Sequence, residues 1–156
     1  MIFRQYKREY ESRLIEIFKS NCPKYFDAKD EVDFINFLEK YTDENYLVVF
    51  RDNEIIGCGG HYTKDTTHGI AWVMFERNSI GSKQLLNVCD AFFSEILNRI
   101  LEEGKGFDIY INTTQLLEKL FNRYGFKTFQ IIEDGFGDGL NEVKMKKINK
   151  KSFNLH

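Results

Sequence analysis

Two segments near the start of the chain carry apolar residues at the spacing of an amphipathic helix. The first repeats them at Tyr10, Leu14, Ile17 and Phe18, and the second at Phe34, Phe37, Leu38 and Tyr41. The run Asn21-Cys22-Pro23 ends the first predicted helix, and Asp27 or Asp30 can cap the second. The chain is therefore expected to begin with two helices.

The apolar period then changes to that of β-strands. Residues 46–50 and 55–62 flank a polar turn at 51–54, so they are predicted to form a hairpin. Residues 69–75 give a third strand after another polar turn. This region is expected to form a three-strand meander.

The longest periodic element follows the third strand. Its apolar residues are Leu85, Leu86, Cys89, Phe92, Phe93, Ile96, Leu97 and Ile100, which predict a long helix that Gly104 ends. After it the pattern predicts a strand at 107–111, a helix at 116–124, and strands at 126–132 and 143–148. A mixed sheet with helices on both faces satisfies this order, so the chain is expected to be an α/β protein.

Composition and charge narrow the possible classes of protein. The 156 residues allow one compact domain, and 15 Phe residues can build a large core. A net charge of -2 gives no positive field for a phosphate backbone, so nucleic acid is not an expected partner. The N-terminal sequence becomes charged before any apolar stretch long enough for a signal peptide or membrane span, so a cytoplasmic protein without a membrane partner is expected.

The three cysteines do not indicate a metal site or a disulfide framework. Cys22, Cys58 and Cys89 lie far apart in the sequence and form no C-x-x-C pair. They are expected to be small buried side chains in a reducing compartment.

A turn of small residues at 77–82 leads from the third strand into the long helix. Such a turn presents backbone N–H groups at the positive end of the helix dipole, which suits a phosphate or pyrophosphate. The alternative is an ordinary helix start with Ser79 or Ser82 as its N-cap. Gly81-Ser82-Lys83 is not a P-loop, because no glycine stands five residues before Gly81.

A meander, a small-residue turn into a long helix, and then a strand and a helix ending in Tyr124-Gly125-Phe126 follow one another along the chain. From about residue 46 to 148, this order resembles the GNAT superfamily of acetyl-CoA-dependent N-acetyltransferases. Further motifs resemble one of its subgroups: Trp72 to Phe75, Thr113-Thr114-Gln115, Leu120-Phe121, the loop 134–140 and Met145. The resemblance implies a mostly antiparallel mixed sheet of six to seven strands with helices on both faces. It also implies a single domain at 1–148, followed by a polar tail at 149–156.

The resemblance implies acetyl-CoA as co-substrate and no metal ion. In the family, the turn carries a Gln/Arg-x-x-Gly-x-Gly/Ala pattern that holds the coenzyme pyrophosphate. Its three positions are occupied here by Arg77, Ile80 and Ser82, or, one residue earlier, by Glu76, Ser79 and Gly81. By analogy, backbone N–H groups at a bulge place Met74 and Phe75 against the acetyl and pantetheine arm.

The full set of implied coenzyme contacts comes from both halves of the chain. It consists of Met74, Phe75, Arg77, Ile80, Gly81, Ser82, Lys83, Asn112, Thr114 and Phe121. For Asn112 and Thr114 the alternative is simple capping of the helix that follows them.

The reaction implied by the family is direct attack of a neutral amine on the thioester carbonyl, with the coenzyme thiolate leaving. The candidate bases for the amine proton are Glu76, at the end of the strand at 69–75, and His61, at the end of the strand before it. Asp108 and Tyr110 are further alternatives.

The position of the family's usual proton donor departs from the pattern. The tyrosine that stands four residues before the Gly-Phe pair is replaced here by Phe121, which has no proton to give. Tyr124 lies three residues further along the same predicted helix and is the candidate acid, with packing or proton supply by water as the alternatives.

The sequence therefore predicts an acetyl-CoA-dependent N-acetyltransferase acting on the amine of a small molecule. The alternatives are a non-catalytic acyl-CoA-binding or partner-binding domain and a protein or peptide N-acetyltransferase. Four aromatic residues of the early helices can line an acceptor pocket or simply form core: Phe26, Phe34, Phe37 and Tyr41. A monomer or a homodimer is expected, the latter because the last strand is predicted to lie at an edge of the sheet.

Overall fold

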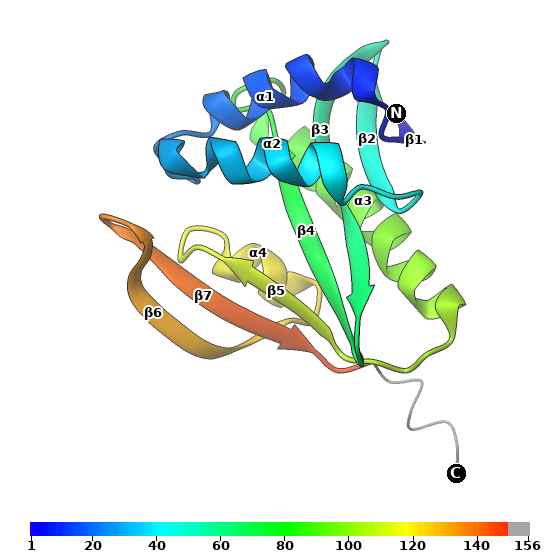
Figure 1. The fold of residues 1–156 in the computed structure, drawn as a ribbon, viewed down its shortest axis with the longest axis vertical. Helices are drawn as coiled ribbons and strands as arrows, with labels where there is room; N and C mark the ends of the chain where they lie inside the picture. Colours follow the sequence, from blue (N-terminus) through cyan, green and yellow to red (C-terminus); the bar gives the residue numbers. More distant parts are fainter. Residues whose placement is uncertain (150–156) are drawn as a thin grey trace. The chain divides into compact units, whose positions relative to one another are not determined.

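The computed structural model describes residues 1–149, and Figure 1 shows its fold. The chain forms two compact units. Unit 1 comprises Met1–Gly60 and Ala71–Ile96, and unit 2 comprises His61–Ile70 and Leu97 to the end of the described residues.

Seven strands follow one another in the sheet in the order β1-β2-β3-β4-β5-β7-β6. Their bounds are β1 Ile2–Gln5, β2 Tyr46–Arg51, β3 Glu54–Lys64, β4 Thr67–Phe75, β5 Ile109–Thr113, β6 Lys127–Gly137 and β7 Leu140–Lys147. The pairs β1–β2, β2–β3, β5–β7 and β6–β7 are antiparallel, and β4–β5 is parallel. The predicted mixed, mostly antiparallel sheet is therefore confirmed.

The helices of unit 1 cover both faces of its strands (Figure 1). On one face, Phe34 belongs to a buried cluster with Val48 of β2. On the other, Phe92 packs on Phe3 of β1, with 5.3 Å between the ring centroids. The helices and 3-10 turns of the described chain are η1 Arg8–Tyr10, α1 Glu11–Ser20, η2 Ala28–Asp30, α2 Glu31–Lys40, α3 Ser82–Glu103 and α4 Glu118–Arg123. No helix within residues 1–149 is long and apolar enough to cross a membrane.

Stacked aromatic rings form much of the core of unit 1. Phe18 of α1 is fully buried and stacks on Phe26 and Phe34, with ring centroids 5.1 and 5.5 Å apart. The ring centroid of Trp72, in β4, lies 5.2 Å from that of Phe34. Such offset pairs add about 0.5–1.5 kcal/mol beyond the area that they bury. For Phe34, the core alternative is confirmed.

Two residues assigned to buried helical stripes are exposed. Tyr41 is 69% exposed because α2 ends at Lys40, so its ring lies past the last helical turn. Leu86 is 37% exposed, because Val88 and Cys89 supply the buried residues of this part of α3 instead.

The cysteines Cys58 and Cys89 are buried and free, as predicted. Burial raises the pKa values of their thiols to about 12 and about 11.

The predicted position of the last strand is wrong. The strand β7 pairs with β5 on one side and with β6 on the other, so β6 is the edge strand. The register of β6 shifts between Thr128 and Gln130, and such bulges blunt a strand edge. The argument for a homodimer through the C-terminal strand is thereby removed.

The β6–β7 hairpin of unit 2 is held by side-chain hydrogen bonds. Gln115 donates through Nε2 to the Gly139 carbonyl at 2.7 Å and accepts through Oε1 from the Asn141 amide at 2.9 Å. Asp134 Oδ1 accepts from the Gly139 amide at 2.8 Å.

The tail predicted at 149–156 is described only at its first residue. Asn149 is buried, and its amide donates to Asp108 Oδ1 at 3.1 Å. Residues 150–156 lie outside the described residues.

Candidate functional site

The end of β4 carries the first predicted coenzyme contacts. Met74 is buried, and the ring of Phe75 packs edge-on against Phe92, with centroids 5.8 Å apart. Trp72 has a φ of 43°, a left-handed conformation that is rare for a bulky residue, and its carbonyl accepts from Tyr46 Oη at 2.8 Å. The strand is thus irregular two residues before Met74. Irregularities of this kind turn backbone groups out of regular pairing.

Glu76, a candidate base, is held by Arg13 of α1. Arg13 Nη1 donates to Glu76 Oε2 at 2.8 Å, and Nη2 donates to the Ile55 carbonyl at 2.9 Å. The hydrogen bond from Arg13 lowers the pKa of Glu76, and the charge of Arg13 adds to this effect, while burial opposes it. The carboxylate is therefore ionised at neutral pH.

The turn after Glu76 is tied to α1 and to the residues beside it. Ser79 Oγ donates to the Glu76 carbonyl at 2.8 Å, and the Arg77 amide donates to Ser20 Oγ at 3.3 Å. The guanidinium of Arg77 lies 5.9 Å from the ring centroid of Tyr25, within the range of a cation–π contact. The turn residues Glu76, Arg77 and Ser79 are therefore brought together.

Helix α3 begins at Ser82, so Gly81 precedes it and the proposal of Ser79 or Ser82 as N-cap is wrong. The amide of Leu85 donates to the Gly81 carbonyl at 2.9 Å. The amides of Ser82, Lys83 and Gln84 come before this bond and have no carbonyl four residues back within the helix. Residues 81–84 are all exposed, whereas Ile80 is half-buried. An anion can therefore reach the first turn of α3.

In unit 2, Asn112 and Thr114 lie at the end of β5. Asn112 is exposed, while Thr114 is only 4% exposed and its Oγ1 has no hydrogen-bond partner among the described residues. The N-cap of α4 is Leu117, without a side-chain cap, so the capping alternative for Asn112 and Thr114 is wrong.

Phe121 of α4 is a core residue of unit 2. It is 4% exposed, and its ring packs edge-on against Phe126 with centroids 6.2 Å apart. Tyr124, the candidate acid, follows α4 as its C-cap residue and is half-buried.

Replacing Phe121 with tyrosine would restore the hydroxyl that the resembling family has at this position. Because the site is buried, we expect Phe121→Tyr to lower the free energy of unfolding by about 1–3 kcal/mol, measured by urea denaturation. Phe129→Tyr is the matched control, since Phe129 is 54% exposed and its added hydroxyl would reach water. Equal stability of the two variants would contradict the buried placement of Phe121.

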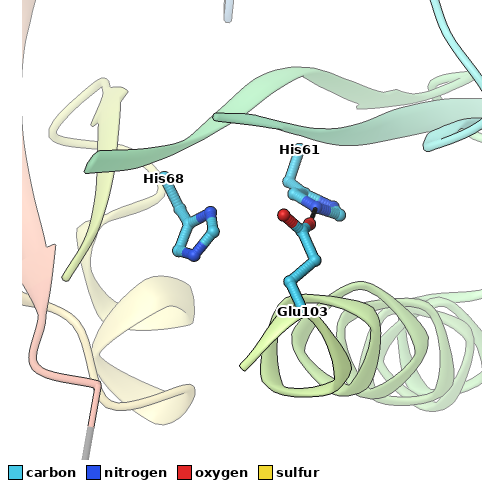
Figure 2. Close-up of side chains that lie close together, drawn as sticks. All are labelled: His61, His68 and Glu103. Carbon is cyan, nitrogen blue, oxygen red and sulfur yellow. Dashed lines mark hydrogen bonds and ion pairs between the residues drawn. The ribbon is translucent and has the colours of Figure 1, made fainter. Parts of the chain in front are cut away.

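His61, the other candidate base, belongs to a buried polar cluster of unit 2 (Figure 2). Its Nε2 bonds to Glu103, the last residue of α3. Thr63 Oγ1 bonds to His68 Nδ1 at 2.8 Å and donates to Glu103 Oε1 at 3.3 Å. Burial lowers the pKa of His68, so this ring is neutral at neutral pH.

Glu103 stays ionised in this cluster. Burial alone would raise its pKa, but the hydrogen bonds from His61 and Thr63 lower it. Sequence reasoning missed Glu103 because it is 42 residues from His61 and looks like an ordinary polar helix residue. The further alternatives for the base are engaged in other contacts. Asp108 accepts from the Asn149 amide, and the ring of Tyr110 packs on Phe129.

Comparison with known proteins identifies the fold. No protein-family model matches the chain, and no curated protein matches its sequence. Among solved structures, a protein assigned to the GNAT family of acetyltransferases from Desulfovibrio desulfuricans is similar with a TM-score of 0.73 and 12% identity, over 94% of this chain and 98% of that one.

Two further structures with this fold are of enzymes named for their activities. The aminoglycoside 6′-N-acetyltransferase from Enterococcus faecium has a TM-score of 0.69 and 14% identity, over 95% of this chain and 97% of its own. N-acetylglutamate synthase from Neisseria gonorrhoeae, complexed with coenzyme A and N-acetyl-glutamate, has a TM-score of 0.61 and 14% identity, over 95% of this chain and 35% of its own. The chain therefore has the fold of GNAT acetyltransferases.

Proposed function

We propose that this chain is an N-acetyltransferase that uses acetyl-CoA as donor and a small primary amine as acceptor. The observation that carries the proposal is the exposed start of α3, where three amides precede the first intrahelical hydrogen bond. This helix start belongs to a fold that is shared with an N-acetylglutamate synthase solved with coenzyme A.

The coenzyme pyrophosphate is proposed to bind at the first turn of α3. The positive end of the helix dipole and the amides of Ser82, Lys83 and Gln84 favour an anion there. Arg77 and Lys83 are exposed and add positive charge around the turn. A pyrophosphate carries two negative charges in this setting, so it gains from both the amides and the cations.

The proposed reaction is a direct transfer of the acetyl group from the thioester to the amine. The neutral amine nitrogen attacks the thioester carbonyl carbon, a C–N bond forms, and the C–S bond breaks as its electron pair leaves with the coenzyme thiolate. Backbone N–H groups near Met74 and Phe75 are proposed to stabilise the charge on the carbonyl oxygen. The amine loses a proton to a base, and the thiolate, a fair leaving group at neutral pH, takes one up.

Glu76 is proposed as the base. Its carboxylate is ionised and follows the strand that carries the proposed acetyl contacts, whereas Nε2 of His61 is already bonded to Glu103. The proposed acid is Tyr124 of unit 2, and water is its alternative. Asn112, Thr114 and Phe121, also of unit 2, remain predicted coenzyme contacts, as Ile80 and Gly81 do in unit 1.

The proposal of a small-molecule acceptor is supported by two enzymes of similar structure, an aminoglycoside 6′-N-acetyltransferase and an N-acetylglutamate synthase. A cytoplasmic location, a single domain, and a monomeric or homodimeric state remain predictions from the sequence.

Titration calorimetry with acetyl-CoA tests the proposed donor. Saturable binding of one coenzyme per chain is expected, with clearly weaker binding of acetyl-pantetheine, because the latter has no pyrophosphate for the start of α3. Equal affinity for the two thioesters would contradict the pyrophosphate site. No binding of acetyl-CoA at millimolar concentration would contradict the donor itself.

A thiol-release screen separates the enzyme from the alternatives. With acetyl-CoA present, thiol release is expected with small primary amines and amino acids and not with peptides. Release only with peptides would favour a protein or peptide N-acetyltransferase. Coenzyme binding without release for any acceptor would favour a non-catalytic acyl-CoA-binding domain.

A further inference from the structure

Two histidines and a glutamate converge in the buried polar cluster of unit 2. His61 comes from β3, His68 from β4 and Glu103 from the last turn of α3, and Figure 2 shows the Glu103 carboxylate directed at His61 with the His68 ring beside them. One potential ligand atom of each residue lies within 4.8 Å of those of the other two. We propose that His61, His68 and Glu103 bind a divalent transition-metal ion of the Zn²⁺ type.

The donor set has the chemistry that such an ion requires. Two imidazole nitrogens and one carboxylate oxygen form a common ligand set for Zn²⁺, which is bound at about 2.0–2.2 Å by either atom type. Ligand atoms on a tetrahedral zinc ion lie about 3.3 Å apart, as follows from those bond lengths. Modest rotations of three side chains bring atoms within 4.8 Å to that separation.

Hydrogen bonds within the cluster leave two ring nitrogens without partners. His61 is 4% exposed and His68 is fully buried, and Nδ1 of the first and Nε2 of the second have no hydrogen-bond partner among the described residues. Buried polar atoms are seldom left unsatisfied in native proteins. Each of the two rings, whose centroids are 5.9 Å apart, therefore has one hydrogen-bonded nitrogen and one without a partner among the described residues.

The surroundings favour a structural ion. The imidazole of His61 has a side-chain exposure of only 1%, whereas the carboxylate side chain of Glu103 is 25% exposed and gives the ion a route from solvent. The ligands come from three different elements, so the ion would tie the end of the β3–β4 hairpin to the last turn of α3. Metal binding would therefore raise the stability of the folded chain.

The test is titration of the full metal-free chain with Zn²⁺, followed by the same titration with Co²⁺. One ion per chain is expected, with an increase in melting temperature and the intense visible absorption of tetrahedral Co²⁺. His61→Ala and His68→Ala are each expected to weaken Zn²⁺ binding by more than about 10-fold, as loss of even an outer partner of a metal ligand does. Glu103→Gln keeps the size of the side chain and removes its charge, and the same loss is expected.

The controls are a histidine and a cysteine that do not belong to the cluster. His156→Ala removes the third histidine, and Cys22→Ser removes a half-buried thiol, so both variants should bind Zn²⁺ as the parent does. Circular dichroism of metal-free Glu103→Gln shows whether that variant is folded. The proposal is overturned by the absence of saturable binding, by unchanged affinity in His61→Ala and His68→Ala, or by loss of binding in His156→Ala alone.

Discussion

Gly60→Ala is expected to lower the free energy of unfolding by about 3 kcal/mol or more, one of the largest effects of any single methyl group in this chain. Gly60 of β3 pairs with Tyr46 of β2. A Cβ at Gly60 would lie 2.1 Å from the Asn45 carbonyl oxygen and 2.8 Å from Tyr46 Cα. Both are backbone atoms, so no side-chain rotation relieves the clash and the two strands must separate.

Urea denaturation followed by tryptophan fluorescence measures this effect. Trp72 is the single tryptophan and packs against rings of the unit 1 core, so its emission reports the unfolding of that unit. Gly81→Ala is the matched control, because a Cβ there meets no atom within 4 Å. We expect Gly81→Ala to change stability by less than about 0.5 kcal/mol. Gly60→Ala with the stability of Gly81→Ala would contradict the described β2–β3 register.

The elements that the sequence predicts well are those whose signal is local. The helices α1, α2 and α3 bury stripes at helical spacing, and Gly104, with a φ of 70°, ends α3 as predicted. The hairpin turn at Asp52 and Asn53 also follows from its own residues, since both adopt positive φ. Local periodicity is sufficient to predict an element wherever one of its faces is buried and the other is in contact with solvent.

The elements that the sequence does not predict depend on distant partners. The strand β1 is short and mostly exposed, and it exists because Ile2–Gln5 pairs with β2, more than forty residues later. Likewise, β7 lies between β5 and β6, and nothing within Leu140–Lys147 distinguishes an inner strand from an edge strand. Alternating apolar residues predict which face of a strand is buried, but they do not predict which strands lie beside it in the sheet.

The candidate site divides in the same way. The turn into α3 is visible in the sequence, because small residues and a following helix are neighbours in the chain. The Arg13–Glu76 and His61–Glu103 pairs span 63 and 42 residues, and no local pattern links their members. Sequence reasoning therefore indicates the proposed anion site and misses the Arg13 pairing that lowers the pKa of Glu76.

Glu76→Gln is expected to lower kcat of the proposed acetyl transfer by roughly 10²–10⁴-fold, the usual contribution of a general base. Gln keeps the oxygen that accepts from Arg13, so the variant is expected to stay folded. Glu16→Gln is the control, since Glu16 also pairs with Arg13, at 3.2 Å, and its side chain is 68% exposed. Initial rates of thiol release over a range of amine concentrations separate kcat from KM. A full kcat in Glu76→Gln would exclude Glu76 as the base.

The pH dependence of kcat/KM gives a second, independent test of the same role. A base works in its ionised form, so activity falls on the acid side as pH drops through its pKa, and the Arg13 hydrogen bond places that fall below the usual range of a glutamate. Arg13→Ala removes the largest cause of the lowered pKa and leaves burial, which raises it, so the acid limb must move toward neutral pH. The change at higher pH, where the acceptor amine itself loses its proton and becomes reactive, is expected to stay at the same pH in both proteins. An acid limb at the same pH in the parent and in Arg13→Ala would show that another group accepts the proton, even if Glu76→Gln is slow.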